Sequence, residues 1–111
     1  MEDCLFCKII KGDIPSSLVY QDDMVYAFRD INPRAPVHVL IIPKKHISTL
    51  NDMQDEDETL MGHIMLTAKK IAEMEGIAES GYRTIFNCGK NGRQMVMHIH
   101  CHVLGGKLLS E

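Results

Sequence analysis

The sequence has no tryptophan, only 5% aromatic residues and no long apolar run. Its longest uncharged apolar stretch, residues 37–42, is interrupted by His38, whereas a membrane-spanning helix needs about 20 apolar residues. A basic excess is also missing, because 12 Lys and Arg stand against 15 Asp and Glu. We therefore expect neither a membrane segment nor binding to a nucleic-acid backbone.

The beginning of the sequence, Met1-Glu2-Asp3-Cys4, is acidic and does not have the positive charge and apolar stretch of an export signal. A cytoplasmic location is expected, in which the four cysteines are reduced thiols or metal ligands. The length of 111 residues, with 45% hydrophobic and 24% charged residues, predicts one globular domain over residues 1–111.

The apolar pattern predicts about five strands, one long helix and one short one. Apolar stretches bounded by turn residues indicate strands at residues 17–20, 24–29, 37–42, 82–87 and 95–104. Helical spacing from Leu60 to Ala72 indicates a helix of about 20 residues, with Asp55 and Glu58 resembling a capping box and Gly76 ending it. Residues 4–11 favour a short helix or a tight knuckle. Because no regular helical crossovers separate the strands, the fold class is α+β with a mainly antiparallel sheet.

One long helix covers only one face of such a sheet. The other face must then carry a ligand site or a partner subunit.

Three histidines alternate with apolar residues near the end of the sequence. Because successive side chains of a strand point to opposite faces, His98, His100 and His102 share one face, about 6.6 Å apart along the chain. The residues between them, Ile99, Cys101 and Val103, point to the helix-covered core.

Two chemistries suit such a row of histidines. Imidazoles are common metal ligands, but a third one two positions further on reaches the same ion only if the strand bends. Alternatively, a neutral central imidazole attacks phosphorus while its neighbours handle protons. A straight strand favours the second chemistry, and the first remains an alternative.

The stretch His98-Ile-His-Cys-His-Val-Leu104 resembles the signature of the histidine-triad (HIT) superfamily. Further motifs occur in the family's order and spacing and resemble its Hint branch, the purine nucleoside phosphoramidases. These motifs are Phe6-Cys-Lys-Ile-Ile10, Ile14-Pro15, Phe28-Arg-Asp-Ile31, Asn32-Pro-Arg-Ala-Pro36, His38, Ile42-Pro-Lys-Lys-His46, Asn87 and Val103-Leu-Gly-Gly106. The resemblance covers nearly the whole chain.

The resemblance implies a nucleotide hydrolase that cleaves nucleoside phosphoramidates or other AMP or GMP derivatives at the α-phosphate. By position, His100 is the nucleophile that forms a nucleotidyl-histidine intermediate, and His102 hydrogen-bonds the phosphate and helps to protonate the leaving amine. His38 completes the proton network and His98 orients its neighbours. No metal is required for catalysis in this scheme.

The resemblance also implies a nucleotide cleft and a homodimer that pairs the long helices and the region of residues 82–87. The residues of the cleft are Phe6, Ile9 and Phe28 around the base, Ile31 beside it, Asp30 on the ribose hydroxyls, and Asn87, Gln94 and Met95 near the phosphate. Without the resemblance, each apolar residue here is expected in the core, and Asp30 and Asn87 in turns.

The chain departs from the branch at residues 92–95, which are Gly-Arg-Gln-Met. The branch usually has a glycine at the position of Arg93 and a serine or threonine at that of Met95. The departures leave the nucleophile in place but put the efficiency and the leaving-group preference in question.

A Cys-x-x-Cys pair, Cys4 and Cys7, has the spacing of a metal knuckle, although one pair alone is a weak signal. The resemblance supplies two further ligands, His46 and His98, for a structural Zn²⁺ site. The alternative is a pair of reduced cysteines without metal.

Three functions thus stay open. The favoured one is the nucleotide hydrolase with a purine nucleotide as substrate. The others are a nucleotide-binding or scaffold protein with vestigial catalysis, and a metal hydrolase that uses the triad as ligands.

Overall fold

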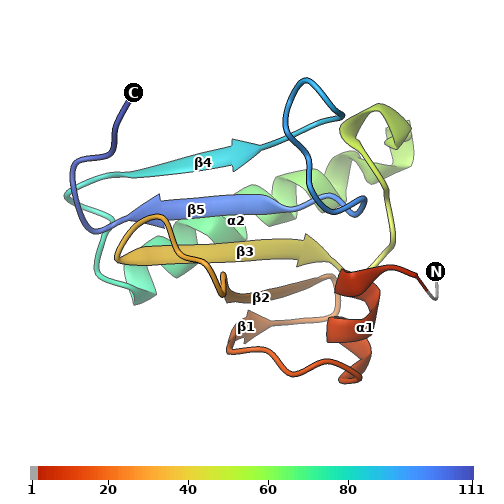
Figure 1. Ribbon diagram of the computed structural model, residues 1–111, viewed down its shortest axis with the longest axis horizontal. Coiled ribbons are helices and arrows are strands. Elements are labelled where there is room, and N and C mark those ends of the chain that lie inside the picture. The colour runs from red at the N-terminus through yellow and green to blue at the C-terminus, as the bar shows by residue number, and fades with distance from the viewer. Residues whose placement is uncertain (1–2) are drawn as a thin grey trace.

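The computed structural model describes residues 3–111 and contains one antiparallel sheet with two α-helices (Figure 1). The strands are β1 (Leu18–Gln21), β2 (Val25–Arg29), β3 (Val37–Pro43), β4 (Tyr82–Phe86) and β5 (Cys101–Gly105), and the helices are α1 (Leu5–Lys11) and α2 (Glu58–Met74). In space the strands follow the order β1-β2-β3-β5-β4, with each neighbouring pair antiparallel. The α+β class, the five strands and the two helices are as the sequence predicts.

The two faces of the sheet are covered by different helices. Helix α2 runs behind the sheet in Figure 1, and its apolar stripe, which includes Ile64, Ala68 and Ile71, packs on Val39, Ile41 and other buried residues of β2, β3 and β5. Helix α1 contributes Phe6 and Ile9 to a second cluster on the other face, which comprises Phe6, Ile9, Tyr26, Phe28, Leu40 and Ile42. The second face is therefore partly covered by α1, which the one-helix expectation did not include.

Helix α2 differs from the prediction at its N-terminal end only. The helix begins at Glu58, after a 3₁₀ turn over Asp55–Asp57, and Asp55 does not form the predicted cap. Gln54 is the N-cap of this turn, and Asp57 at its third position is the return partner: the buried Asp57 carboxylate accepts a hydrogen bond from the Gln54 backbone at 2.8 Å and pairs with Lys45 at 2.6 Å. At the other end Gly76 adopts a φ of 73° and the chain leaves the helix there, close to the predicted end.

The last strand is shorter than predicted, because residues 95–100 do not pair in the sheet. Pairing between β3 and β5 stops at Ile41 opposite Cys101. Beyond that point the Pro43 carbonyl oxygen bonds the His98 ring and the Ile99 amide donates to Ile47, so the backbone groups have other partners. Proline also has no amide hydrogen to continue a ladder.

No helix within residues 3–111 has the length and apolar character needed to cross a membrane.

Candidate active site

The three C-terminal histidines lie on one face although only His102 belongs to β5. All are buried, with exposed fractions of 0%, 6% and 8% for His98, His100 and His102. The intervening Ile99 and Cys101 belong to the core on the α2 side, where burial raises the pKa of Cys101 to about 12. The alternation predicted from the sequence is thus present.

The ring of His100 is held by a main-chain carbonyl. Its Nδ1 lies 2.8 Å from the His98 carbonyl oxygen, which only accepts hydrogen bonds, so Nδ1 carries the hydrogen. In the neutral ring Nε2 then has the free lone pair. His100 Nε2 has no hydrogen-bond partner within residues 3–111. Every fully buried side-chain nitrogen of these residues does have a partner, so His100 Nε2 is not fully buried and reaches solvent. A neutral, accessible imidazole nitrogen is a nucleophile.

A chain of hydrogen bonds sets the tautomers of two further histidines. The Arg34 backbone amide donates to His38 Nδ1 at 3.1 Å, so the hydrogen of neutral His38 is on Nε2. That Nε2 lies 2.9 Å from His102 Nδ1, and the Arg34 guanidinium lies 3.4 Å from the same Nδ1. Because both neighbours donate, His102 Nδ1 accepts and its Nε2 carries the hydrogen.

Burial keeps these rings neutral. Desolvation lowers the pKa of His102 to about 4 and lowers the pKa of His100 and His38 below the ordinary value of 6.5. The positive charge of Arg34 acts in the same direction on the pKa of His38 and His102. At neutral pH the site therefore combines an unprotonated Nε2 on His100 with a proton-bearing Nε2 on His102. The centroids of the two rings lie 5.0 Å apart.

The residues expected around the nucleoside lie beside this row. The Phe6 ring is 5.1 Å from the His100 ring and 5.6 Å from Phe28, and Ile9 belongs to the same cluster. Asp30 Oδ2 lies 3.4 Å from His38 Nε2. The residue expected to bind the ribose hydroxyls is thereby next to the chain of hydrogen-bonded histidines. Ile31 differs from these residues, because it is 89% exposed and packs on none of the core.

The residues expected near the phosphate form a loop that Gln94 holds together. The Gln94 amide nitrogen donates to the Ser48 and Val96 carbonyls, and its oxygen accepts from the Gly89 amide. Asn87 donates to the Gly92 carbonyl, so Gln94 and Asn87 both use side-chain atoms within the loop. Met95 is 87% exposed.

Arg93 has an unusual backbone. It is the one non-glycine among the described residues with a positive φ, at 62°, a region that costs a side-chain-bearing residue energy. A glycine is favoured at such a position, which agrees with the departure noted at Arg93.

A second cluster joins the N-terminal segment to the triad. Cys4, Cys7, His46 and His98 bring one ligand atom each within 4.8 Å of one another. The Cys4 Sγ lies 3.3 Å from His98 Nδ1, the Cys7 Sγ lies 3.4 Å from His46 Nδ1, and the two Nδ1 atoms are 3.2 Å apart. All four residues that the resemblance implies as zinc ligands are therefore brought together.

These distances fit a tetrahedral metal site. Bond lengths of about 2.3 Å to sulfur and 2.1 Å to nitrogen place neighbouring ligand atoms about 3.4 Å apart for two nitrogens and about 3.8 Å apart for two sulfurs. The Pro43 carbonyl lies 2.8 Å from His98 Nε2 and holds the hydrogen there, so the Nδ1 lone pair faces the cysteines. The residues present thus fit Zn²⁺.

The triad histidines do not converge on a common point, since His98, His100 and His102 form no candidate metal group over residues 3–111. The other group is Asp30, His38 and His102, in which the two ring nitrogens are 2.9 Å apart. That is the length of a hydrogen bond and shorter than the separation of two nitrogens on a tetrahedral metal.

Sequence reasoning missed the functional place of two residues. Arg34 was noticed as part of a motif but given no role, although it contacts both His38 and His102. Pro43 likewise occurs in a motif without a role of its own, yet its carbonyl fixes His98. The signal for Arg34 was a cation between two prolines, close in the chain to His38.

A buried row of three histidines with an accessible, unprotonated Nε2 on the middle one, beside a fourth histidine in a proton chain, defines a histidine-triad protein. The HIT domain profile matches residues 11–108, and the chain belongs to the HIT family.

Relatives are similar over almost their full length. The purine nucleoside phosphoramidase of Escherichia coli K12 is 56% identical over 108 residues, which is 97% of this chain and 91% of that protein. The HIT family hydrolase of Legionella pneumophila is 53% identical with a TM-score of 0.95, covering 97% and 96% of the two chains. A histidine triad protein of Clostridium difficile is 48% identical with a TM-score of 0.97, covering 100% and 96%.

Proposed function

We propose that the protein is a hydrolase that cleaves nucleoside phosphoramidates, or other AMP or GMP derivatives, at the α-phosphate. The name of the Escherichia coli relative supports the reaction class and a purine base. The hydrolase name of the Legionella relative supports the same class. In this chain the observation that carries the proposal is the His100 ring, with Nδ1 fixed by a carbonyl at 2.8 Å and Nε2 open to solvent.

The reaction has two displacements. His100 Nε2 forms a bond to phosphorus while the phosphorus–nitrogen bond breaks, and the departing amine takes the hydrogen of His102 Nε2. The negative charge left on the His102 ring is held at Nδ1 by the His38 hydrogen bond and the Arg34 guanidinium until water restores the proton. Water then attacks the nucleotidyl-histidine, His102 takes the proton, and His100 is released with a nucleoside monophosphate. His38 supports His102 in both steps, because its Nε2 hydrogen bonds His102 Nδ1 at 2.9 Å and stabilises the required tautomer.

The nucleoside binds on the α1 side of the row. Phe6, Phe28 and Ile9 supply apolar surface for a base, and Asp30 accepts hydrogen bonds from ribose hydroxyls. These contacts orient the α-phosphate toward His100, whose ring Phe6 touches edge-on.

Trapping of the intermediate tests the reaction. The protein is incubated with labelled adenosine 5′-phosphoramidate, quenched and digested, and the modified residue is located by mass spectrometry. The label is expected on His100. A label on another residue, or turnover with no covalent adduct at any time, contradicts the proposed nucleophile.

A second candidate function is nucleotide binding with weak or vestigial catalysis. The resemblance implies a hydroxyl residue as the usual one at the position of Met95, and a thioether donates no hydrogen bond to the substrate. This candidate expects binding of AMP without turnover of any phosphoramidate.

Zinc has a structural place in the proposal. Cys4, Cys7, His46 and His98 would hold it in a closed site that ties the N-terminal segment to the sheet. When bound, it supplies cross-linking of these segments and no reaction chemistry. The third candidate, a hydrolase with a catalytic metal on the triad, expects turnover to be lost in excess chelator while the fold remains intact.

A homodimer completes the proposal. Strand β4 is at the edge of the sheet, where its outer backbone groups have no neighbouring strand in the described chain. Helix α2 exposes Met65, Leu66 and Met74 by 43%, 66% and 53%, and Tyr82 of β4 is 37% exposed. These surfaces fit a second copy, and sedimentation at micromolar concentration is expected to give a dimer. A monomer would contradict it.

The cytoplasm is the proposed location, because none of the four cysteines, all within the described residues, is in a disulfide, and unpaired cysteines persist in a reducing compartment.

A further inference from the structure

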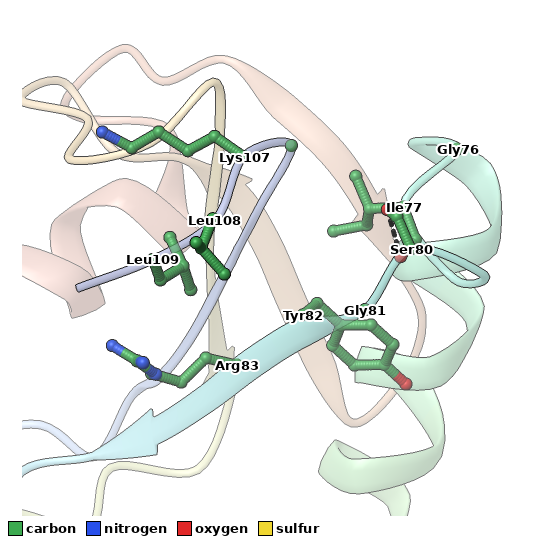
Figure 2. Close-up of a pocket in the computed structure, with 10 residues that line it drawn as sticks. Gly76, Ile77, Ser80, Gly81, Tyr82, Arg83, Lys107, Leu108 and Leu109 are labelled. Carbon is green, nitrogen blue, oxygen red and sulfur yellow. Dashed lines mark hydrogen bonds between the residues drawn. The ribbon is translucent and has the colours of Figure 1, made fainter. Parts of the chain in front are cut away.

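A groove lies on the triad face of the sheet, next to His102. In the antiparallel ladder Arg83 is opposite Leu104 and Ile85 is opposite His102, so these side chains share one face. The segment after β5 crosses over them and closes a groove of about 410 Å³. It is lined by Arg34, Arg83, Ile85, Leu104, Lys107, Leu108, Leu109 and Ser110. Figure 2 shows Arg83 and Lys107 extending toward the same side, with Leu108 and Leu109 between them.

The groove is positively charged in a chain with a net charge of −3. Arg34, Arg83 and Lys107 line it, and no carboxylate does. None of these three cations has an ion-pair partner in the part of the chain that the structure describes. Arg29 provides a contrast, because both of its terminal nitrogens bond the Glu75 carboxylate, at 2.6 and 3.1 Å.

One residue that lines the groove contacts the ring of His102, at the nitrogen opposite the one that gives the proton. The Arg34 guanidinium lies 3.4 Å from His102 Nδ1. The residues expected around the nucleoside lie on α1, β2 and the loop that follows, which is the β3 side of β5. Arg83 and Ile85 lie on β4, at the other side of β5. A nucleotide bound as proposed therefore leaves the cationic groove for the group that departs.

We infer that Arg34, Arg83 and Lys107 form a subsite for an anionic leaving group, so that the preferred substrates are nucleoside phosphoramidates of amines that carry a carboxylate, as amino acids do. The inference rests on the proposed function. In the reaction the phosphorus–nitrogen bond breaks, His102 gives its proton to the nitrogen, and the carboxylate stays ionised against the guanidinium groups. Arginine suits this task because its planar fork matches a carboxylate.

Two substrates that differ in one group test the subsite. They are the adenosine 5′-phosphoramidates of β-alanine and of β-alanine amide, which present a carboxylate and a neutral amide at the same place. The ratio of kcat/KM, acid over amide, is expected to be about tenfold at low salt. Raising NaCl from about 0.02 to 0.5 M is expected to bring this ratio toward one, since salt screens exposed charges.

Variants locate the effect. Arg34→Gln, Arg83→Gln and Lys107→Gln are each expected to lower the ratio by about twofold, within the range of a partly exposed charge pair, so that the three together account for the tenfold ratio. Lys69→Gln is the matched control, because Lys69 lies on α2 behind the sheet and pairs only with Glu73 at 3.1 Å. It is expected to leave the ratio unchanged.

The outcomes separate this inference from the proposed function. Turnover of both substrates with a ratio of one or less at low salt, or an equal drop in Lys69→Gln, overturns the subsite alone. If the wild type turns over neither substrate, the affinities of the acid and the amide for the His100→Ala variant are measured by calorimetry. A tighter Kd for the acid in that variant supports the subsite even if the wild type hydrolyses neither substrate, in which case the proposed function alone is wrong.

Discussion

The Nδ1 atom of His100 lies 2.8 Å from the carbonyl oxygen of His98, so the orientation of one triad histidine depends on the backbone of another. His98 itself is fully buried, held by the Pro43 carbonyl on one side and by Cys4 and Cys7 on the other. The N-terminal cysteines and the candidate nucleophile are thus joined through a single residue. A substitution at the cysteines is therefore expected to affect the orientation of His100, and a substitution at His100 to affect the cysteine cluster.

Replacement of the nucleophile is the first prediction. His100→Ala should lower kcat on adenosine phosphoramidate by at least about a thousandfold, because the neighbouring His102 Nε2 carries a hydrogen and has no free lone pair to attack. AMP affinity by calorimetry and the circular dichroism spectrum should stay close to wild type. His63→Gln, on α2 away from the row, is the control and should keep its activity. Activity retained in His100→Ala would reject the assignment.

The second prediction concerns zinc at the Cys4, Cys7, His46 and His98 cluster. Metal analysis of protein purified without added metal should find about one zinc per chain, because the four ligand atoms are pre-arranged. Cys4→Ser should weaken zinc binding by at least about tenfold and lower Tm, since one strong ligand is lost. Cys88→Ser, which removes a half-buried thiol outside the cluster, should do neither. Wild-type protein free of zinc, with an unchanged Tm on adding it, would contradict the site.

Met95 gives the third prediction. Met95→Ser should raise kcat/KM on phosphoramidates by about two- to tenfold, because the hydroxyl supplies a donor near the scissile bond that a thioether lacks. Met97→Ser, at a side chain 53% exposed, is the control for the loss of a methionine. An equal or lower rate in Met95→Ser would show that the hydroxyl is not limiting.

The fourth prediction concerns acid. In the folded protein burial lowers the pKa of His102 from 6.5 to about 4. As the pH falls from 6.5 toward 4, the unfolded chain therefore binds a proton that the folded chain does not, and the free energy of unfolding decreases. Below about pH 4 both the folded and the unfolded chain carry the proton, so His102 causes no further decrease in the free energy of unfolding. Urea unfolding at several pH values should show the decrease, on the order of 1–3 kcal/mol. His102→Gln should reduce the slope, and an unchanged slope would contradict the assignment.

Asp22 in the β1–β2 turn provides the fifth prediction. One oxygen accepts from the Met24 and Val25 amides at 2.8 and 3.0 Å, and the other from the Tyr20 hydroxyl at 2.8 Å and His63 at 2.7 Å. These hydrogen bonds hold the pKa of Asp22 well below its usual range, although burial opposes them.

An amide cannot accept at both atoms, so Asp22→Asn should cost about 1–3 kcal/mol of unfolding free energy, measured in urea. Asp23→Asn is the matched control. Asp23 is exposed, and its replacement should change stability by less than about 0.5 kcal/mol. Equal effects of the two variants would rule out the special role of Asp22.

Local pattern was enough for most of the fold. Apolar stretches between turn residues located the strands because each buries at least one face, and the spacing of Leu60, Ile64 and Ala68 located α2 for the same reason. The boundaries failed where a long-range bond decided them. The carboxylate that holds the turn before α2 belongs to Asp57, not Asp55, and it pairs at 2.6 Å with Lys45 from a distant segment.

The sequence by itself determined which face each histidine of the triad takes, since alternation is a property of an extended backbone and persists over residues 98–100 without sheet pairing. It also supplied the four residues of the Cys-His cluster, through the family's motif. Only the tertiary structure decided the tautomers of His38, His100 and His102, because each depends on a donor or acceptor brought close by folding. The meeting of Arg34 with Arg83 and Lys107 was likewise decided by folding, since like charges far apart in sequence give no local signal.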